Sequence, residues 1–222
     1  MTAHDAKPLR ALIFDLDGTL TDTLPLCYAA FAHAFEAFGL GAQTDPEIHA
    51  LFGPSEEGIL RRLVPDRWQE CYEVYLRFYE QHHNQYARVF PGIEPLLEWI
   101  ASTRIPTGIV TAKGAESAAI TVDRLGLRRY FAAVEAGGPD GARKPQGIGV
   151  MLSRWGCHPT EAVYIGDSPY DMRAAREAGV APLGAAWATG ASAHALRSAG
   201  AAVVFESPTA LHLWLARAGV EQ

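Results

Sequence analysis

Two aspartates stand two residues apart near the start of the chain, directly after an apolar run. Asp15 and Asp17 follow residues 12–14, and Gly18 comes next. The run predicts a buried strand, and because side chains alternate along a strand, both carboxylates are expected on the same side of it. An unpaired buried carboxylate is costly, so an ordinary buried strand does not end in two of them. The pair therefore indicates either a turn at Asp17-Gly18 or a metal site.

Four further polar residues stand at the ends of predicted strands or the starts of predicted helices. Thr111 ends one apolar run, Asp167 ends another with Asp171 one helical turn beyond, and Lys144 precedes a helical segment. In an open parallel sheet, ligands bind at the carboxyl ends of the strands, so we expect these side chains to meet Asp15 at one edge. Several carboxylates at one edge repel each other unless a cation lies among them, and hard oxygen ligands suit Mg²⁺.

Each of these residues also has a purely structural interpretation. Thr111 can cap the helix that follows it. Ser168 can cap a helix that starts with proline, with Asp171 reaching back in a capping box. Lys144 can lie in a solvated loop. The joint arrival of all of them at one sheet edge favours the chemical interpretation.

The elements that must position these residues alternate along the chain. Strands are predicted at 12–15, 105–110, 131–135, 162–165, 180–187 and 202–205, and helices at 95–102, 116–125, 146–155, 169–178, 192–198 and 208–218. This alternation predicts an α/β fold with a parallel sheet and right-handed crossovers.

A helical block separates the first strand from the others. Helical spacing predicts helices at 24–38 and 55–63, and a capping box of Asp66 and Gln69 predicts a long helix to about residue 86. Its aromatic face is expected to pack on the first helix, and no convincing strand is seen between 24 and 89. We therefore predict an α/β core, residues 1–22 and 90–222, interrupted by a small helical domain, 23–89, with hinges near 21–25 and 88–91.

The composition indicates which classes of partner and which cellular compartment to expect. The 222 residues carry a formal net charge of −6 and no basic block, which argues against nucleic acid. Three distant cysteines, Cys27, Cys71 and Cys157, argue against a disulfide framework and favour a reducing cytoplasm. The first ten residues lack an apolar signal core, and no run is long enough to cross a membrane. We expect a cytoplasmic monomer or homodimer.

Four motifs together resemble those of the haloacid-dehalogenase-like hydrolase superfamily. Residues 15–20, DLDGTL, resemble the first motif, Thr111 the second, Lys144 before a helix the third, and residues 166–171, GDSPYD, the fourth. They occur in the family order and span essentially the whole chain. The resemblance implies a Rossmann-like parallel sheet core with an inserted α-helical cap, as in the phosphoglycolate-phosphatase-like branch.

The resemblance also implies a chemistry, a Mg²⁺-dependent phosphatase reaction through an aspartyl-phosphate. Asp15 is then the nucleophile and Asp17 the general acid and base. Thr111 would donate hydrogen bonds to the phosphoryl oxygens, and Lys144 would neutralise charge. The implied metal ligands are Asp15, the main-chain carbonyl of Asp17, Asp167, and Asp171 as a ligand or as a neighbour of the ligands.

Substrate contacts are implied at both ends of the expected site. Backbone N–H groups after Asp15 would cradle the phosphate, helped by Gly18 having no side chain. The second motif continues with Ala112, where the family often has Asn. In the helical block, the loop containing Gly53 and Ser55 is the expected specificity loop, and it also resembles that of pyrophosphatases.

The substrate expected from the resemblance is a small phosphorylated metabolite similar to phosphoglycolate. Because Asp17 is present where dehalogenases lack a carboxylate, phosphoryl transfer is favoured. The alternatives are an inorganic pyrophosphatase or a sugar phosphomutase of the same superfamily, although His33 lacks the setting typical of mutases. A signalling receiver domain is much shorter, and a non-enzymatic binding protein would not need the complete acid set.

Overall fold

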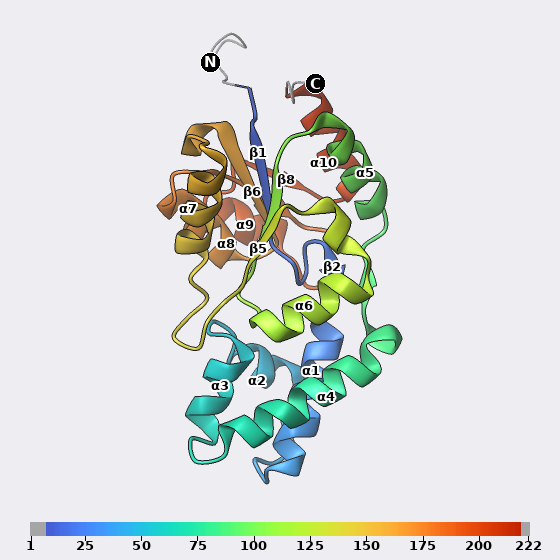
Figure 1. Cartoon of the computed structure of the whole chain (residues 1–222), viewed down its shortest axis with the longest axis vertical. Helices are drawn as coiled ribbons and strands as arrows, with labels where there is room; N and C mark the ends of the chain where they lie inside the picture. The colour runs from blue at the N-terminus through green and yellow to red at the C-terminus, as the bar shows by residue number, and fades with distance from the viewer. Residues whose placement is uncertain (1–7, 219–222) are drawn as a thin grey trace.

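The computed structural model describes residues 8–218, and its centre is a six-stranded sheet (Figure 1). The strands are β1 (Ala11–Phe14), β4 (Thr107–Val110), β5 (Ala133–Glu135), β6 (Ala162–Gly166), β7 (Ala181–Ala185) and β8 (Val203–Phe205). They pair in the order β5-β4-β1-β6-β7-β8, and every pairing is parallel. The predicted α/β class is confirmed.

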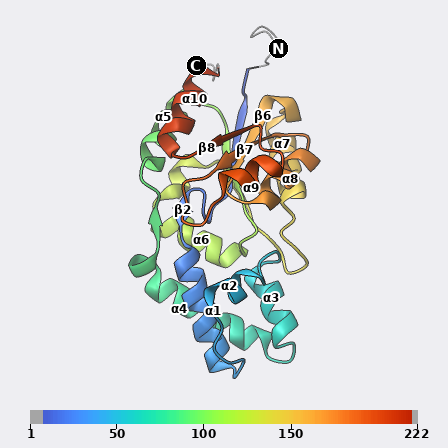
Figure 2. The same cartoon turned by 180° about the vertical axis from the view of Figure 1, so that it is seen from behind.

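Both faces of the sheet are buried under helices, which is why β1 is apolar at every position. Leu12 and Phe14 pack in one apolar layer, and Ala11 and Ile13 in the other. The first layer is completed by α5 (Ile93–Thr103), α6 (Ala115–Arg124), the short 3₁₀ helix η1 (Leu127–Tyr130) and α10 (Pro208–Arg217). The second is completed by α7 (Lys144–Trp155) and α8 (Pro169–Glu177), with α9 (Ala193–Ser198) beside α8 (Figure 2); the 3₁₀ helix η2 (Pro159–Glu161) leads into β6.

The register of the three central strands brings their carboxyl ends together. Phe14 of β1 lies beside Ile109 of β4 and Ile165 of β6. One or two residues later, the three strands deliver the side chains predicted for the site: Asp15, Thr111 and Asp167.

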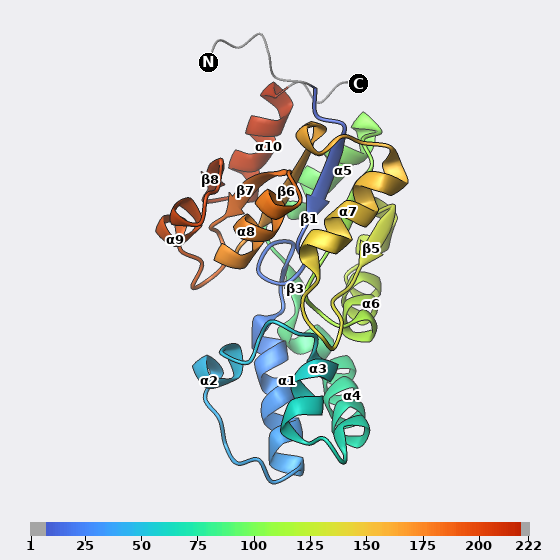
Figure 3. The same ribbon diagram turned by 90° about the vertical axis from the view of Figure 1, so that its left-hand side faces the viewer.

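A helical block lies beyond this edge of the sheet (Figure 3). It consists of α1 (Leu24–Ala37), α2 (Asp45–His49), α3 (Glu56–Leu63) and α4 (Trp68–Tyr86). The block has its own apolar cluster, in which the rings of Phe31 on α1 and Tyr75 on α4 lie 4.6 Å apart. The aromatic face of the long helix therefore packs on the first helix.

Two short strands join the block to the sheet. β2 (Thr21–Asp22) and β3 (Arg88–Val89) pair antiparallel where the chain enters and leaves the block. The expectation that residues 24–89 contain no strand is thus wrong at 88–89, where pairing with β2 decides the conformation. The predicted division at 22/23 and 89/90 runs through these crossings.

Two helix starts differ from the sequence prediction. The long helix begins at Trp68, because the chain first makes a turn in which the N–H of Arg67 donates to the carbonyl of Val64 at 3.0 Å. Asp66 therefore precedes the helix, and the predicted capping box is wrong. Helix α7 begins at Lys144 instead of 146, so Lys144 lies in the first turn of a helix and not in a loop.

Candidate active site

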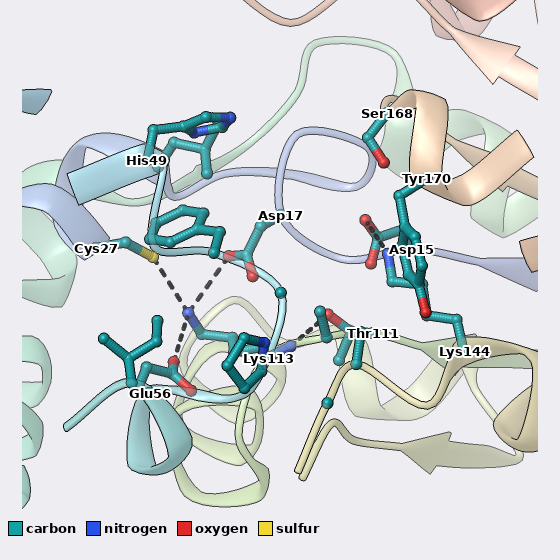
Figure 4. A pocket seen from close by; sticks show the side chains of 18 of the residues that line it. Asp15, Asp17, Cys27, His49, Glu56, Thr111, Lys113, Lys144, Ser168 and Tyr170 are labelled. Carbon is teal, nitrogen blue, oxygen red and sulfur yellow. Dashed lines mark hydrogen bonds and ion pairs between the residues drawn. The ribbon is translucent and has the colours of Figure 1, made fainter. Parts of the chain in front are cut away.

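A cavity of about 610 Å³ lies between the sheet edge and the helical block (Figure 4). The sheet core contributes most of its polar lining, and the helical block contributes mainly apolar side chains. The predicted residues that line it are Asp15, Asp17, Thr111, Ala112, Lys144, Asp167 and, from the helical block, Gly53. Sequence elements that are far apart thus meet at one site.

Asp15 and Lys144 form a buried ion pair at the base of the cavity. The Nζ atom of Lys144 lies 3.0 Å from Oδ2 of Asp15 and 2.5 Å from Oδ1 of Asp171. Burial raises the pKa of Asp15 to about 7, with help from the charges of Asp171 and Asp17 and against the effect of Lys144. Burial alone would lower the pKa of Lys144, but Asp15 and Asp171 raise it above its ordinary value. Lys144 is therefore a permanent cation beside the candidate nucleophile.

Three carboxylates of the site fit a divalent cation. One oxygen from each of Asp15, Asp167 and Asp171 lies within 4.8 Å of the others. Asp15 Oδ1 is buried and has no hydrogen-bond partner among the described residues. Burial, then the charges of Asp171 and Asp15, raise the pKa of Asp167 well above its ordinary value. Because a cation would satisfy the unpartnered oxygen and relieve this repulsion, the donor set suits Mg²⁺.

Asp171 is already fully engaged by the protein. Its Oδ1 accepts from Lys144 and from the hydroxyl of Tyr164, at 2.5 and 3.1 Å. Its Oδ2 accepts from the N–H and the hydroxyl of Ser168, at 3.0 and 2.6 Å. Ser168 in turn caps α8, as the structural interpretation of this motif predicted. Of the two roles left open for Asp171, this arrangement favours orienting Lys144 over direct contact with a metal.

Asp17 faces a different lysine. Its Oδ1 accepts from the hydroxyl of Thr23 and lies 3.5 Å from Nζ of Lys113. Lys113 also lies 3.4 Å from Oε1 of Glu56, the first residue of α3, and 3.3 Å from the sulfur of Cys27 (Figure 4). Two carboxylates two residues apart in the sequence are thus held by separate cations.

The sequence analysis missed Lys113. Burial alone would lower its pKa, but Asp17 and the other groups around it raise the pKa well above the ordinary value. A signal was available, because Lys113 stands two residues after Thr111, in the loop that follows the carboxyl end of a strand, where ligand-binding residues of a parallel sheet lie. Its partner Glu56 is remote in sequence, so the pairing itself required the fold.

The second-motif residue Thr111 is buried and points its hydroxyl into the site region. Its Oγ accepts from the N–H of Lys113 at 3.2 Å, and helix α6 is capped at Gly114 without a side-chain bond. Thr111 therefore does not cap the following helix.

Two of the predicted substrate contacts are not among the residues lining the cavity. The N–H of Gly18 donates to the carbonyl of Thr21 at 2.8 Å, so it is not directed at a phosphate. The hydroxyl of Ser55 is buried without a partner among the described residues, and its N–H donates to Gly138 at 3.0 Å. Ser55 lines a second hollow, together with residues of α4 and of the start of α6.

Several polar side chains of the helical block do not line the cavity. Arg61 pairs with Glu57 and covers the ring of Trp68. His33 is exposed and stacks on Phe78, away from the residues that line the cavity. Within the described part of the chain, Arg62, Arg77 and His83 also lie outside the cavity lining.

The comparison with protein families now gives the class of the protein. The model described as haloacid dehalogenase-like hydrolase matches residues 12–185. Because this match spans most of the chain, the protein belongs to the haloacid dehalogenase-like hydrolases, and the resemblance seen in its motifs is confirmed.

Individual relatives agree with this assignment. A phosphoglycolate phosphatase from Synechococcus elongatus is 31% identical over 186 residues, which are 81% of this chain and 84% of that protein. Pyrophosphatase PpaX from Bacillus velezensis is 27% identical over 187 residues, covering 82% and 85%. A haloacid dehalogenase-like hydrolase from Streptococcus pneumoniae has a similar structure, with a TM-score of 0.77, 27% identity, and coverage of 93% and 98%.

Two further findings bear on the environment of the protein. Within residues 8–218, we find no helix long and apolar enough to cross a membrane. Cys27, Cys71 and Cys157 are all buried and free.

Proposed function

We propose that this hydrolase is a Mg²⁺-dependent phosphatase that cleaves a small phosphorylated metabolite through an aspartyl-phosphate on Asp15. The observation that carries the proposal is the buried Asp15–Lys144 pair at the base of a cavity, beside Asp167, where one Asp15 oxygen has no partner in the described part of the chain. A carboxylate held beside a permanent cation and a candidate metal site is placed to attack an anionic phosphoryl group.

The first half-reaction transfers the phosphoryl group to the protein. An oxygen of Asp15 bonds to phosphorus as the bond from phosphorus to the leaving oxygen breaks, and Asp17 gives its proton to that oxygen. Lys144 stays paired with Asp15 and balances the negative charge of the phosphoryl group. The hydroxyl oxygen of Thr111 accepts a hydrogen bond from the N–H of Lys113, and this bond does not use the hydroxyl proton. The hydroxyl can therefore donate that proton to a phosphoryl oxygen.

The second half-reaction restores the enzyme. Water bonds to phosphorus, Asp17 takes a proton from it, and the bond between phosphorus and Asp15 breaks to release phosphate. One group thus serves as acid and then as base, and the protons balance over the cycle.

The cation would be held by Asp15, Asp167 and the main-chain carbonyl of Asp17, with Asp171 orienting Lys144. Mg²⁺ supplies positive charge that keeps Asp15 ionised and screens the incoming phosphate. Full turnover of a thoroughly demetallated sample in excess chelator would contradict this assignment.

The helical block, residues 23–89, is proposed as the cap that selects the substrate. It supplies apolar walls and the Gly53 loop to the cavity, while the core supplies the groups that act on phosphorus. The cap also keeps bulk water from the reacting groups, which strengthens their electrostatic interactions.

The relatives support two substrates for a first test, since they are named phosphoglycolate phosphatase and pyrophosphatase PpaX. Purified protein with Mg²⁺ should release phosphate from at least one member of a panel that contains 2-phosphoglycolate, pyrophosphate and sugar phosphates. The favoured class is a phosphoglycolate-like monoester, and preference for pyrophosphate would select the alternative. A requirement for a sugar bisphosphate activator would reveal a mutase, and no phosphate release from any substrate would reject the proposal.

The three free, buried cysteines support a reducing compartment, and we place the enzyme in the cytoplasm on this basis. We propose no nucleic-acid or membrane partner, in line with the net charge of −6.

A further inference from the structure

The ammonium of Lys113 lies in the cavity region and is almost completely buried, with 2% of its side chain exposed. Lysine is rarely buried to this degree unless it is paired. Two carboxylates compensate it, Asp17 at 3.5 Å and Glu56 at 3.4 Å, and the ring of Tyr79 lies 4.4 Å away. The side chain of a lysine enclosed in this way has little conformational freedom, so it restrains the carboxylates that it contacts.

Glu56 anchors this lysine from the helical block. One of its oxygens, Oε2, accepts from the N–H of Gly114 at 2.6 Å, and the other, Oε1, accepts from the hydroxyl of Ser117 at 2.6 Å. A Cβ on Gly114 would lie 2.7 Å from Oε2, so a larger residue here would displace the Glu56 carboxylate from this position. Burial raises the pKa of Glu56, but Lys113 and these hydrogen bonds outweigh burial and hold the pKa below its ordinary value. Glu56 is thus a fixed anion.

The contacts to Asp17 restrict one of its two oxygens. Lys113 and the hydroxyl of Thr23 both act on Oδ1. With Oδ1 held, the carboxyl cannot rotate freely, and Oδ2 is the oxygen available for proton transfer.

We propose that Lys113 is a positioning residue for Asp17, and that Glu56 of the helical block holds Lys113 in place. The proposal rests on the proposed function, because it assumes that Asp17 protonates the leaving oxygen. Lys113 does not touch the reacting atoms in this scheme. It fixes the orientation of the Asp17 carboxyl. Because Glu56 holds Lys113, that orientation depends on the packing of α3 against α6.

The competing interpretation is that Lys113 only ties the helical block to the core. The two interpretations differ in their dependence on the leaving group. Protonation matters most when the leaving alcohol is a weak acid, whereas loss of docking reduces turnover of all substrates alike. The ratio kcat/KM reports the first half-reaction, in which the leaving group departs.

The experiment compares 4-nitrophenyl, phenyl and benzyl phosphate, whose leaving groups are progressively weaker acids but similar in size. In the Lys113→Met variant with Mg²⁺, kcat/KM for benzyl phosphate should fall about 10- to 100-fold more than kcat/KM for 4-nitrophenyl phosphate, a part of the 10²–10⁴-fold worth of acid catalysis. The Lys113→Arg variant keeps the charge and should recover part of this loss. An equal fall across the series would overturn the proposal.

A second pair of variants guards against a folding defect. Met at 113 leaves the Glu56 carboxylate buried without its cation, which is destabilising. Adding Glu56→Gln removes that charge, so the double variant should regain thermal stability but keep the selective loss on benzyl phosphate. Recovery of wild-type turnover of benzyl phosphate by the double variant would overturn the proposal. Failure of the proposed function would show separately, as absence of 4-nitrophenyl phosphate hydrolysis by the wild type or as full activity of Asp15→Asn.

Discussion

Gly18 offers a direct test of the metal site, because its missing side chain leaves room for Asp167. A Cβ at this position would lie 2.2 Å from Oδ2 of Asp167, and the backbone has φ +81°. In Gly18→Ala, the backbone strain costs about 1–2 kcal/mol, the usual penalty of the left-handed conformation for a residue with a Cβ. The collision is a separate effect, which the short Asp167 side chain can avoid only by turning away.

The displacement of Asp167 should weaken Mg²⁺ binding. Disturbing the partners of a metal site typically costs about 10- to 100-fold in affinity. At a Mg²⁺ concentration of about 100 times the wild-type Kd, binding stabilises the folded state by about 2.7 kcal/mol, and a 100-fold loss leaves about 0.4 kcal/mol. For a chain of this size, the Mg²⁺-induced rise in Tm should therefore drop from about 5–11 °C to about 1–2 °C.

Gly41→Ala is the matched control. Gly41 has φ +79°, and no heavy atom lies within 4 Å of the position that a Cβ would take, so this variant carries the backbone strain without the collision. Thermal unfolding of both variants, with Mg²⁺ and with chelator, separates the two effects. Both should lose stability in chelator, but only Gly18→Ala should lose the response to Mg²⁺. An unchanged Mg²⁺ response in Gly18→Ala would refute the placement of the cation beside Asp167.

Other predictions concern the acids and the cap. Asp15→Asn should abolish the phosphoenzyme, which acid-quench trapping with labelled substrate would detect. Asp17→Asn should lower kcat/KM for alkyl phosphates by about 10²–10⁴-fold in initial-rate assays; near-normal rates would exclude it as the acid. Since Asp15 has a folded pKa of about 7, above its unfolded value, its stabilising effect in metal-free protein is complete below about pH 4 and is lost as the pH rises toward 7. Mg²⁺ competes with that proton, so its effect on Tm should grow between about pH 5.5 and pH 7.5; a constant shift would contradict this. Pro54→Ala, in the cavity wall, should change the order of kcat/KM values among phosphate esters, and acetyl phosphate should be affected least.

The strand ends could be predicted from the sequence because local patterns determine them. Apolar runs that stop at Asp15, Thr111 and Asp167 define three strands, and a parallel sheet gathers their carboxyl ends at one edge. The first residue of a helix could not be predicted as well, because a turn that precedes the helix can have the same sequence pattern as its first turn. The chain turns at Arg67 before α4, and Lys144 joins α7 earlier than its Pro-containing context suggests.

Contacts between the helical block and the core could not be predicted in the same way. Glu56 is the first residue of α3, an amphipathic helix with charged residues at both ends, yet its carboxylate is buried against the start of α6. Helical spacing places Glu56 on the same face as Ile59 and Leu60, whereas the neighbouring Glu57 pairs with Arg61 on the same helix. Only the docking of α3 on α6 supplies the partners of the buried carboxylate, the N–H of Gly114 and the hydroxyl of Ser117.

The two lysines of the site divide the chemistry between the two parts of the molecule. Lys144 lies between Asp15 and Asp171, so the ion pair at the nucleophile is built entirely from core elements. Lys113 lies between Asp17 and Glu56, so the ion pair at the acid reaches into the helical block. A change in the block can therefore reach the chemistry through Asp17 without disturbing the pair at Asp15. Substitutions on α3 should accordingly change the protonation of the leaving oxygen by Asp17 more than they change the Asp15–Lys144 pair.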